Sequence, residues 1–183
     1  YIFNRLGEDP SLTLRAVVEE SARLGLTEPD PREDLSGEDV ARKVLILVRE
    51  LDVAAELADV DWANPVPEAL GKLSLEDFWQ RFDELEQAIQ AERAACSSDE
   101  VLRYVGDIVW DGVRGEAHLS AGLRRVRRDS PLGRVRGADS CFEIYTESYG
   151  SQPIVIQGAG AGAVVTARGV FGDVLRLAEG YES

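Results

Sequence analysis

The spacing of apolar residues changes once along this chain, and this change limits its fold more than any other feature. Up to about residue 95, apolar residues recur every three or four positions, as they do on one face of a helix. Beyond Ser98 they alternate with polar residues, as they do in strands. The sequence therefore predicts an α+β fold, in which a mixed β-sheet is covered largely on one face by α-helices.

Two helices are indicated by start and stop signals. Ser11 precedes a run with helical spacing that leads to Gly25, a residue suited to a left-handed helix cap. Ser74 begins another helix, which we expect to end around Ala95. The apolar stripe of this later helix consists of Phe78, Phe82, Leu85 and Ile89.

A helix between these two is expected to begin at Ser36 and to end near Asp52. Asp39 follows Ser36 by three residues, as in a capping box. The apolar run over residues 44–48 could instead form a buried strand, but the capped start favours the helix.

Two connections that contain prolines separate these helices. Pro29 and Pro31 remove backbone donors and disfavour helical geometry in the residues before them, so residues 28–34 should form a loop. Residues 61–72, which also contain prolines and a glycine, are predicted to form a second connection. Loops of this kind often carry functional residues.

The second half of the chain carries the predicted strands. A β-hairpin is expected where residues 111–112, Asp-Gly, separate two alternating runs. Two further strands are predicted over residues 141–146 and 153–157. A glycine-rich loop at residues 158–162 then leads to a final helix over residues 163–178.

Length and charge limit the kind of protein. A chain of 183 residues suits one domain, and 44% apolar with 30% charged residues is typical of a soluble one, without a run long enough to span a bilayer. The formal net charge of -14 argues against nucleic acid and membrane partners. The basic cluster at residues 124–128 lacks interleaved aromatics and is better explained as a solvated strand end.

Cysteine and histidine spacing predicts no metal site. Cys96 and Cys141 do not form a metal-ligand spacing, and His118 has no cysteine or other histidine near it in sequence. A cytosolic chain keeps such thiols reduced, so we expect no disulfide scaffold and a cytoplasmic location. The chain has no methionine and starts at Tyr1 without a signal segment, so we expect a fragment of a longer protein.

Asp39 and Lys43 are the foremost candidates for chemistry. They are four residues apart, so on a helix their side chains share one face and can pair. An exposed ion pair that contributes little is the plain alternative. However, Lys43 lies where the polar first turns meet the apolar run, just after a proline-stiffened acidic loop. A partly desolvated lysine beside carboxylates can hold a proton and deliver it to a developing oxyanion.

Gly158, Gly160 and Gly162 are candidates for ligand contact, because they leave backbone amides at the start of a helix, where anions bind. A tight turn between strand and helix is the alternative. A dinucleotide-binding fingerprint needs an acidic residue about 20 positions later in a βαβ unit, and the chain ends about there, so this loop cannot found a complete nucleotide-binding fold.

Several of these segments resemble motifs of the homoserine dehydrogenases. The resemblance is carried by Tyr-Ile-Phe-Asn at 1–4, Thr-Glu-Pro-Asp-Pro-Arg-Glu-Asp-Leu-Ser-Gly at 27–37, Asp-Val-Ala-Arg-Lys at 39–43 and Gly-Ala-Gly-Ala-Gly-Ala-Val-Val-Thr-Ala-Arg-Gly-Val at 158–170. Between about residues 52 and 116 it depends on general pattern and on Leu-Arg-Tyr-Val-Gly at 102–106.

The resemblance implies roles for the candidate residues. Lys43 would be the proton donor and acceptor at the substrate oxygen, and Asp39 would orient the lysine or the substrate hydroxyl. Glu28 would hold the substrate ammonium, and Asp34 would support the site from close by. The glycine loop would approach NADP or NAD, and of its glycines Gly162 is the first we would assign to this contact.

The resemblance also implies how the chain is organised. Residues 1–183 would form the catalytic and dimerisation domain of an enzyme that interconverts L-homoserine and L-aspartate 4-semialdehyde on the route to threonine and methionine. The nucleotide-binding half would precede Tyr1, so the isolated domain should be inactive. The ending soon after the last helix is similar to bifunctional aspartokinase-homoserine dehydrogenases. A non-catalytic dimerisation or interaction domain is the alternative function.

Overall fold

Helices occupy the first half of the chain and strands most of the second, as the change in periodicity predicts. The computed structural model describes residues 1–160 and 162–180. The elements in chain order are α1 (Ile2–Glu8), α2 (Leu14–Arg23), α3 (Pro31–Leu35), α4 (Glu38–Arg49), the 3₁₀ turn η1 (Leu57–Asp59), β1 (Val60–Trp62), α5 (Glu68–Gly71), α6 (Leu75–Gln80), α7 (Phe82–Ala94), β2 (Glu100–Asp111), β3 (Glu116–Arg127), α8 (Pro131–Arg134), β4 (Asp139–Ile144), β5 (Ile154–Ala159) and α9 (Ala163–Gly180).

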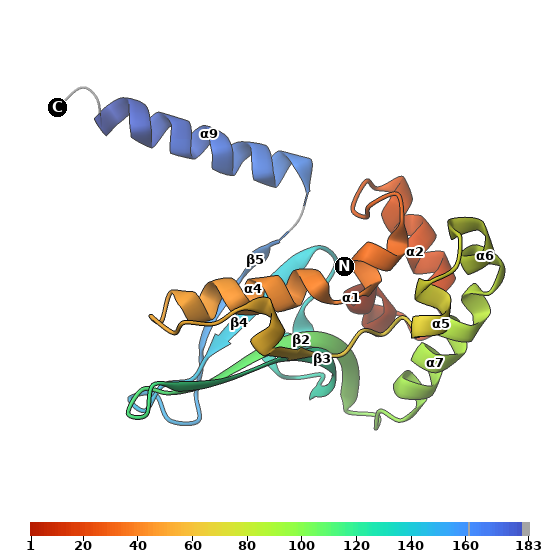
Figure 1. The fold of residues 1–183 in the computed structure, drawn as a ribbon, viewed down its shortest axis with the longest axis horizontal. Coiled ribbons are helices and arrows are strands. Elements are labelled where there is room, and N and C mark those ends of the chain that lie inside the picture. Colours follow the sequence, from red (N-terminus) through yellow and green to blue (C-terminus); the bar gives the residue numbers. More distant parts are fainter. Residues whose placement is uncertain (161, 181–183) are drawn as a thin grey trace.

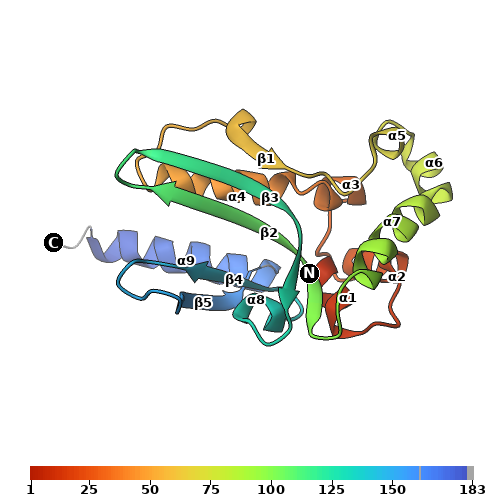
Figure 2. The same cartoon turned by 90° about the horizontal axis from the view of Figure 1, so that it is seen from below.

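The strands form two sheets. A three-stranded sheet has the order β1-β3-β2, with β1 parallel and β2 antiparallel to β3. A two-stranded antiparallel sheet, β4-β5, lies apart from it (Figure 2). The α+β class and the mixed pairing are confirmed, but the expectation of one sheet is wrong. The short helix α8 and the turn after it redirect the chain at the end of β3, so β4 starts a separate sheet.

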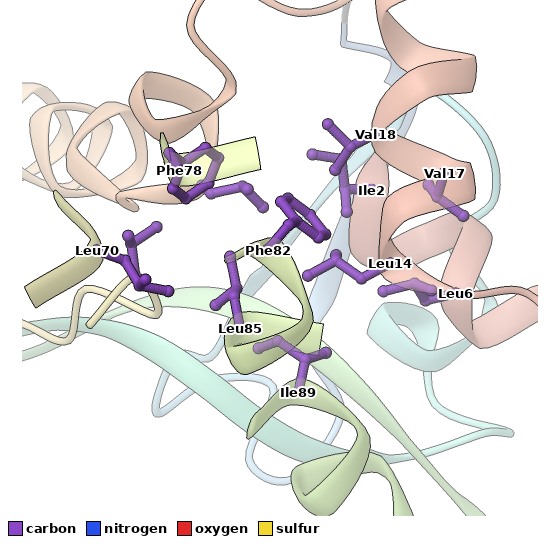
Figure 3. Packing of buried hydrophobic residues seen from close by; sticks show 12 residues of the cluster. Ile2, Leu6, Leu14, Val17, Val18, Leu70, Phe78, Phe82, Leu85 and Ile89 are labelled. Atoms are coloured by element: carbon purple, nitrogen blue, oxygen red, sulfur yellow. The ribbon is translucent and has the colours of Figure 1, made fainter. Parts of the chain in front are cut away.

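Apolar side chains gather in two cores. The larger one lies among α1, α2, α6 and α7, where Phe78 packs edge-on against Phe82 with ring centroids 5.5 Å apart (Figure 3). The smaller one lies between α4 and the three-stranded sheet, which α4 covers on one face (Figure 1). It contains Ala41, Val44, Leu45, Val48, Val60 and Leu119.

Arg103 of β2 ties distant segments to the sheet. This residue is only 6% exposed, and its guanidinium donates hydrogen bonds to five backbone carbonyls. The acceptors belong to α1, to β2 itself and to the segment around α8, so one buried side chain holds together parts of the helical half and of the strand half. They are the carbonyls of Phe3, Leu102, Leu132, Gly133 and Val135.

Several element boundaries differ from the sequence prediction. The helix expected from Ser74 to Ala95 is interrupted at Arg81, where Glu84 N donates to Arg81 O in one tightened turn. Residues 28–34 are not a plain loop, because Asp30 caps the short helix α3. The connection at residues 61–72 contains most of β1 and all of α5.

The last helix differs from the others in its surroundings. α9 extends away from both sheets, and none of its described side chains is buried (Figure 1). Large apolar side chains therefore face solvent along its length. They are Val164, Val165, Val170, Phe171, Val174, Leu175 and Leu177.

Candidate functional site

The acidic segment before α4 is held in a fixed shape by its own side chains. Asp30 is the N-cap of α3: its carboxylate accepts the backbone N–H of Arg32 at 3.0 Å and pairs with the Arg32 guanidinium at 2.5 Å. Pro31 follows at the first helical position, where its missing N–H costs nothing. Arg32 also donates to the carbonyl of Leu73, so this segment is anchored to the chain after α5.

Asp34 joins the two ends of this segment. Its carboxylate accepts the backbone N–H of Glu28 at 2.9 Å. Burial raises the pKa of Asp34, and the nearby charge of Glu28 adds to this, while the hydrogen bond from Glu28 N–H acts in the opposite direction. The structure therefore brings together two of the predicted site residues, Glu28 and Asp34, through backbone rather than through paired side chains.

The start of α4 depends on a glycine. Gly37 is the N-cap, with φ of +78°, a left-handed conformation that glycine adopts without strain. Ser36 lies one residue outside and accepts the backbone N–H of Glu38 at 3.2 Å. The expected capping box between Ser36 and Asp39 is therefore not formed, because the turn at Gly37 moves the helix start one residue onward.

Asp39 and Lys43 lie on one face of α4 and form the predicted ion pair. The Lys43 Nζ is 2.7 Å from the Asp39 Oδ2, and the two side chains are 59% and 72% exposed. Such an exposed pair contributes little to stability. The pair does, however, keep an ammonium and a carboxylate close together on an accessible helix face.

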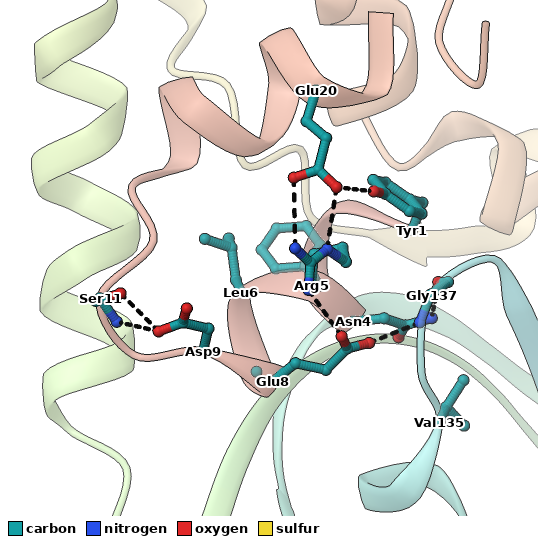
Figure 4. Close-up of polar contacts among 12 residues, drawn as sticks. Tyr1, Asn4, Arg5, Leu6, Glu8, Asp9, Ser11, Glu20, Val135 and Gly137 are labelled. Atoms are coloured by element: carbon teal, nitrogen blue, oxygen red, sulfur yellow. Dashed lines mark hydrogen bonds and ion pairs between the residues drawn. The ribbon is translucent and has the colours of Figure 1, made fainter. Parts of the chain in front are cut away.

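A polar network keeps α1 in position beside this region. The Tyr1 hydroxyl donates to Glu20 at 2.5 Å, and Arg5 binds both Glu20 and Glu8 (Figure 4). Glu8 in turn accepts the backbone N–H of Gly137 at 2.7 Å. The start of the chain is thereby fixed against α2 and against the segment that leads into β4.

The glycine loop is explained in part by packing. Gly158 lies within β5, opposite Ser140 of β4. A Cβ at Gly160 would overlap the Ser140 hydroxyl, and Gly162 has φ of +122° with open space where a side chain would lie. Ala161 lies outside the described residues. Close packing against Ser140 accounts for Gly160, while the open surroundings of Gly158 and Gly162 leave the predicted cofactor contact as a prediction.

Two surface cavities lie away from the predicted site residues. One is lined by Arg49, Glu56, Asp59 and residues 54–55, beyond the end of α4. The other lies among α1, α7 and β2. The Asp39–Lys43 pair lines neither of them, and both of its side chains are mostly exposed to solvent.

Two other kinds of site, a metal centre and a membrane span, have no candidate in the part of the chain that the structure describes. Among residues 1–160 and 162–180, no group of three or more histidine, cysteine, aspartate or glutamate residues could hold a metal ion. In the same part of the chain, no helix is both long and apolar enough to cross a membrane.

Some residues near the site were not singled out by sequence reasoning. The ring of Tyr104 in β2 lies directly against Gly37, and Val40 and Val44 of α4 lie over Gly106 of the same strand. The only sequence signal for Tyr104 and Gly106 was the Leu-Arg-Tyr-Val-Gly run at 102–106, whose residues do not indicate a contact with α4.

The chain matches known proteins along most of its length. The family model described as homoserine dehydrogenase matches residues 1–175. The chain is 43% identical over 180 residues to "Bifunctional aspartokinase/homoserine dehydrogenase 2, chloroplastic" of Arabidopsis thaliana, which covers 97% of this chain and 19% of that protein. It is 38% identical over 166 residues to the "Homoserine dehydrogenase" of Paracoccidioides brasiliensis, which covers 89% of this chain and 44% of that protein. The chain thus spans less than half the length of either relative.

Solved structures share the fold. A Candida auris protein described as of unknown function matches with a TM-score of 0.81 and 36% identity, over 98% of this chain and 50% of that one. A structure of the S. aureus homoserine dehydrogenase matches with a TM-score of 0.67 over 100% of this chain and 41% of that one. Its identity of 21% shows a likeness of fold alone.

Proposed function

Because this chain belongs to the homoserine dehydrogenase family, we propose that it is the substrate-binding and catalytic portion of an enzyme that interconverts L-homoserine and L-aspartate 4-semialdehyde. A nucleotide-binding half would precede it in the complete protein. The observation that carries this proposal is the 2.7 Å pair of Lys43 and Asp39 on an exposed helix face, next to a segment that Asp34 holds in shape.

Lys43 is the proposed proton donor and acceptor. In the direction of homoserine formation, its Nζ gives a proton to the carbonyl oxygen of the semialdehyde while hydride reaches the carbonyl carbon, so that C=O becomes CH–OH. In the reverse direction the neutral amine takes the proton back. Asp39, 2.7 Å away, holds the Nζ in place.

The carboxylates upstream are the proposed substrate contacts. Glu28 offers a carboxylate to the substrate ammonium, and the charge-assisted hydrogen bond between such groups is strong. Asp34 keeps the backbone at Glu28 in position through its 2.9 Å hydrogen bond. Asp39 would also contact the substrate hydroxyl, so that the substrate lies between the acidic segment and α4.

The nicotinamide cofactor, NADP or NAD, supplies the hydride when bound. Gly158, Gly160 and Gly162 are the residues of this chain proposed to approach it. Open space at the Cβ positions of Gly158 and Gly162 supports a close approach of their backbone. Most cofactor contacts, including those that select NADP or NAD, would come from the nucleotide-binding half. Lys43 is exposed on this chain, so that half would also enclose the substrate from the opposite side.

The remaining parts of the proposal concern the whole protein. Similarity to bifunctional relatives supports a fused aspartokinase and a place on the route to threonine and methionine. We also propose a cytoplasmic homodimer with no membrane or nucleic acid partner. The net charge of -14 supports the last point.

Replacing Lys43 tests this function. In the full-length protein, Lys43→Ala should lower kcat for reduction of aspartate semialdehyde by about 100-fold or more, because a positioned proton donor contributes about that factor. The chain offers a matched control: Lys72 of the chain after α5 also forms an exposed pair four residues from a glutamate, Glu68. Lys72→Ala should keep the wild-type rate.

The outcomes separate the main function from the alternative. Wild-type kcat in a folded Lys43→Ala variant would remove Lys43 from the mechanism. The non-catalytic alternative is supported by the apolar side chains exposed on β4 and β5. If the folded full-length protein released no heat on titration with homoserine and did not turn over, a dimerisation or interaction domain would be the better function.

A further inference from the structure

We propose that Tyr104 is a positioning residue, which sets the Asp39–Lys43 pair in place by fixing how α4 lies on the sheet. The inference rests on the proposed function and adds to it a residue in another element. Tyr104 belongs to β2, and its effect on the reaction would pass through the backbone of α4.

The phenol of Tyr104 is itself fixed on two sides. Its hydroxyl donates to the backbone carbonyl of Ala63, just after β1, at 2.7 Å. Its ring lies beside Phe3, with centroids 6.2 Å apart and an angle of 30° between the rings. Burial raises the pKa of Tyr104, which keeps the hydroxyl protonated and able to donate.

The fixed ring determines where α4 can begin. Gly37, the N-cap of α4, is buried, and a Cβ built on it would overlap both the hydroxyl and the Cζ of Tyr104. The backbone at Gly37 therefore touches the phenol directly, with no side chain between them. Asp39 follows two residues later, in the first turn.

A second close contact fixes the rest of the helix. Gly106 lies two residues after Tyr104, on the same face of β2. A Cβ built there would be 2.5 Å from a methyl group of Val44 and 3.1 Å from one of Val40. Val44 directly follows Lys43 in the helix, so the chain touches β2 at the N-cap of α4 and again beside the lysine. Two contacts along one helix fix both its height over the sheet and its rotation.

Lys43 depends on this placement because little else holds it. Its side chain is 59% exposed, and its ion-pair partner among the described residues is Asp39, which belongs to the same helix. Any shift of α4 moves both groups together relative to Glu28 and Asp34. Since a displacement of about 1 Å at a reacting group can cost about 100-fold in rate, the contact at Tyr104 bears on turnover without touching the substrate.

Tyr104→Phe in the full-length enzyme tests the inference, because it removes the bond to Ala63 and keeps the ring. We expect kcat to fall about fivefold, the equivalent of one lost hydrogen bond. KM for aspartate semialdehyde should stay within about twofold, since Glu28, the proposed ammonium contact, lies outside α4, and the hydroxyl proposed to contact Asp39 is absent from this substrate. Tyr149→Phe, at an exposed tyrosine, should change neither. Tyr104→Leu, which also removes the ring, should lower kcat further and still leave KM nearly unchanged.

Tyr104→Phe in a Lys43→Ala background distinguishes an effect that acts through Lys43 from a general disturbance of the fold. If Tyr104 acts through Lys43, adding Tyr104→Phe there should lower the residual kcat less than twofold. An equal fold loss in both backgrounds, a KM that rises as kcat falls, or wild-type kcat in both Tyr104 variants would overturn the inference. Failure of the wild-type enzyme to reduce aspartate semialdehyde would instead overturn the proposed function.

Discussion

Two carboxylates of the acidic segment, Asp30 and Asp34, lie four residues apart, and their surroundings shift their pKa values in opposite directions. Asp30 accepts hydrogen bonds from the side chain of Arg32, which lower its pKa. Asp34 is desolvated by the surrounding chain, which raises its pKa. One carboxylate is therefore stabilised in its charged form by the fold, and the other is stabilised in its neutral form.

These shifts predict opposite pH dependence of stability. The folded pKa of Asp34 lies above its unfolded value, so its contribution is present below the unfolded pKa and is lost as pH rises through the folded one. The contribution of Asp30 is present above its unfolded pKa and is lost as pH falls. From about pH 3 to pH 6, Asp34→Asn should gain stability relative to wild type, and Asp30→Asn should lose it. Urea unfolding at several pH values measures both; slopes of the same sign would contradict this.

A contact between two residues could be predicted from the sequence when both residues lie on the same helix. The pairing of Asp39 with Lys43 follows from their spacing of four, and the structure has it. The contact of Tyr104 with Gly37 joins a strand to a helix start far away in the sequence, and no spacing rule indicates it. The roles of Lys43 and Glu28 stay predictions, since these roles depend on a substrate.

Helix α2 is held at its start by a residue from another helix. The carboxylate of Glu86 in α7 accepts the backbone N–H groups of Leu14 and Arg15, at 2.8 and 2.9 Å. These N–H groups have no partner within α2, and a negative charge at this end also suits the helix dipole. Thr13 caps the same end by accepting from Ala16 N at 3.1 Å.

Removing this distant cap should weaken the helical half of the molecule. Glu86→Ala should lower the free energy of unfolding by about 1 to 2 kcal/mol, the usual cost of losing a helix cap. Glu19→Ala, on the exposed face of α2, is the matched control and should change it by less than about 0.5 kcal/mol. Guanidinium unfolding measures both. Equal effects of the two substitutions would show that the cap contributes nothing.

At the level of elements, periodicity predicted which helices and strands form better than it predicted where they begin and end. The helices around residues 14–23 and 38–49, the hairpin of β2 and β3 and the last helix are confirmed. β1 was missed because a strand of three residues is too short to show alternation. The break at Arg81 was missed because the apolar stripe continues through it with unchanged spacing.

On the scale of the whole molecule, one face of the β4-β5 sheet is apolar and open. Phe142 pairs with Ile156, and Ile144 with Ile154, so all four side chains point to the same side. They are between 39% and 56% exposed. A patch of this kind on a folded domain commonly marks an interface, which is consistent with the proposed homodimer.

A charge placed on this face should separate the proposed dimer. In the full-length protein, Ile156→Lys should convert dimer to monomer in analytical ultracentrifugation, because an unpaired charge would be buried at the interface. Gln157→Lys places the same charge on the neighbouring residue, which faces the other side of the sheet, and should remain dimeric. A dimeric Ile156→Lys variant would locate the interface elsewhere.

The buried guanidinium of Arg103 joins the two halves of the molecule. The carbonyls that it binds include one in α1 and one in α8, just after the hairpin. Neither segment can leave without abandoning a desolvated cation, which costs more than an ordinary hydrogen bond. Melting of the N-terminal helices is thereby coupled to melting of the hairpin, and heat should disrupt both in one cooperative transition rather than in two steps.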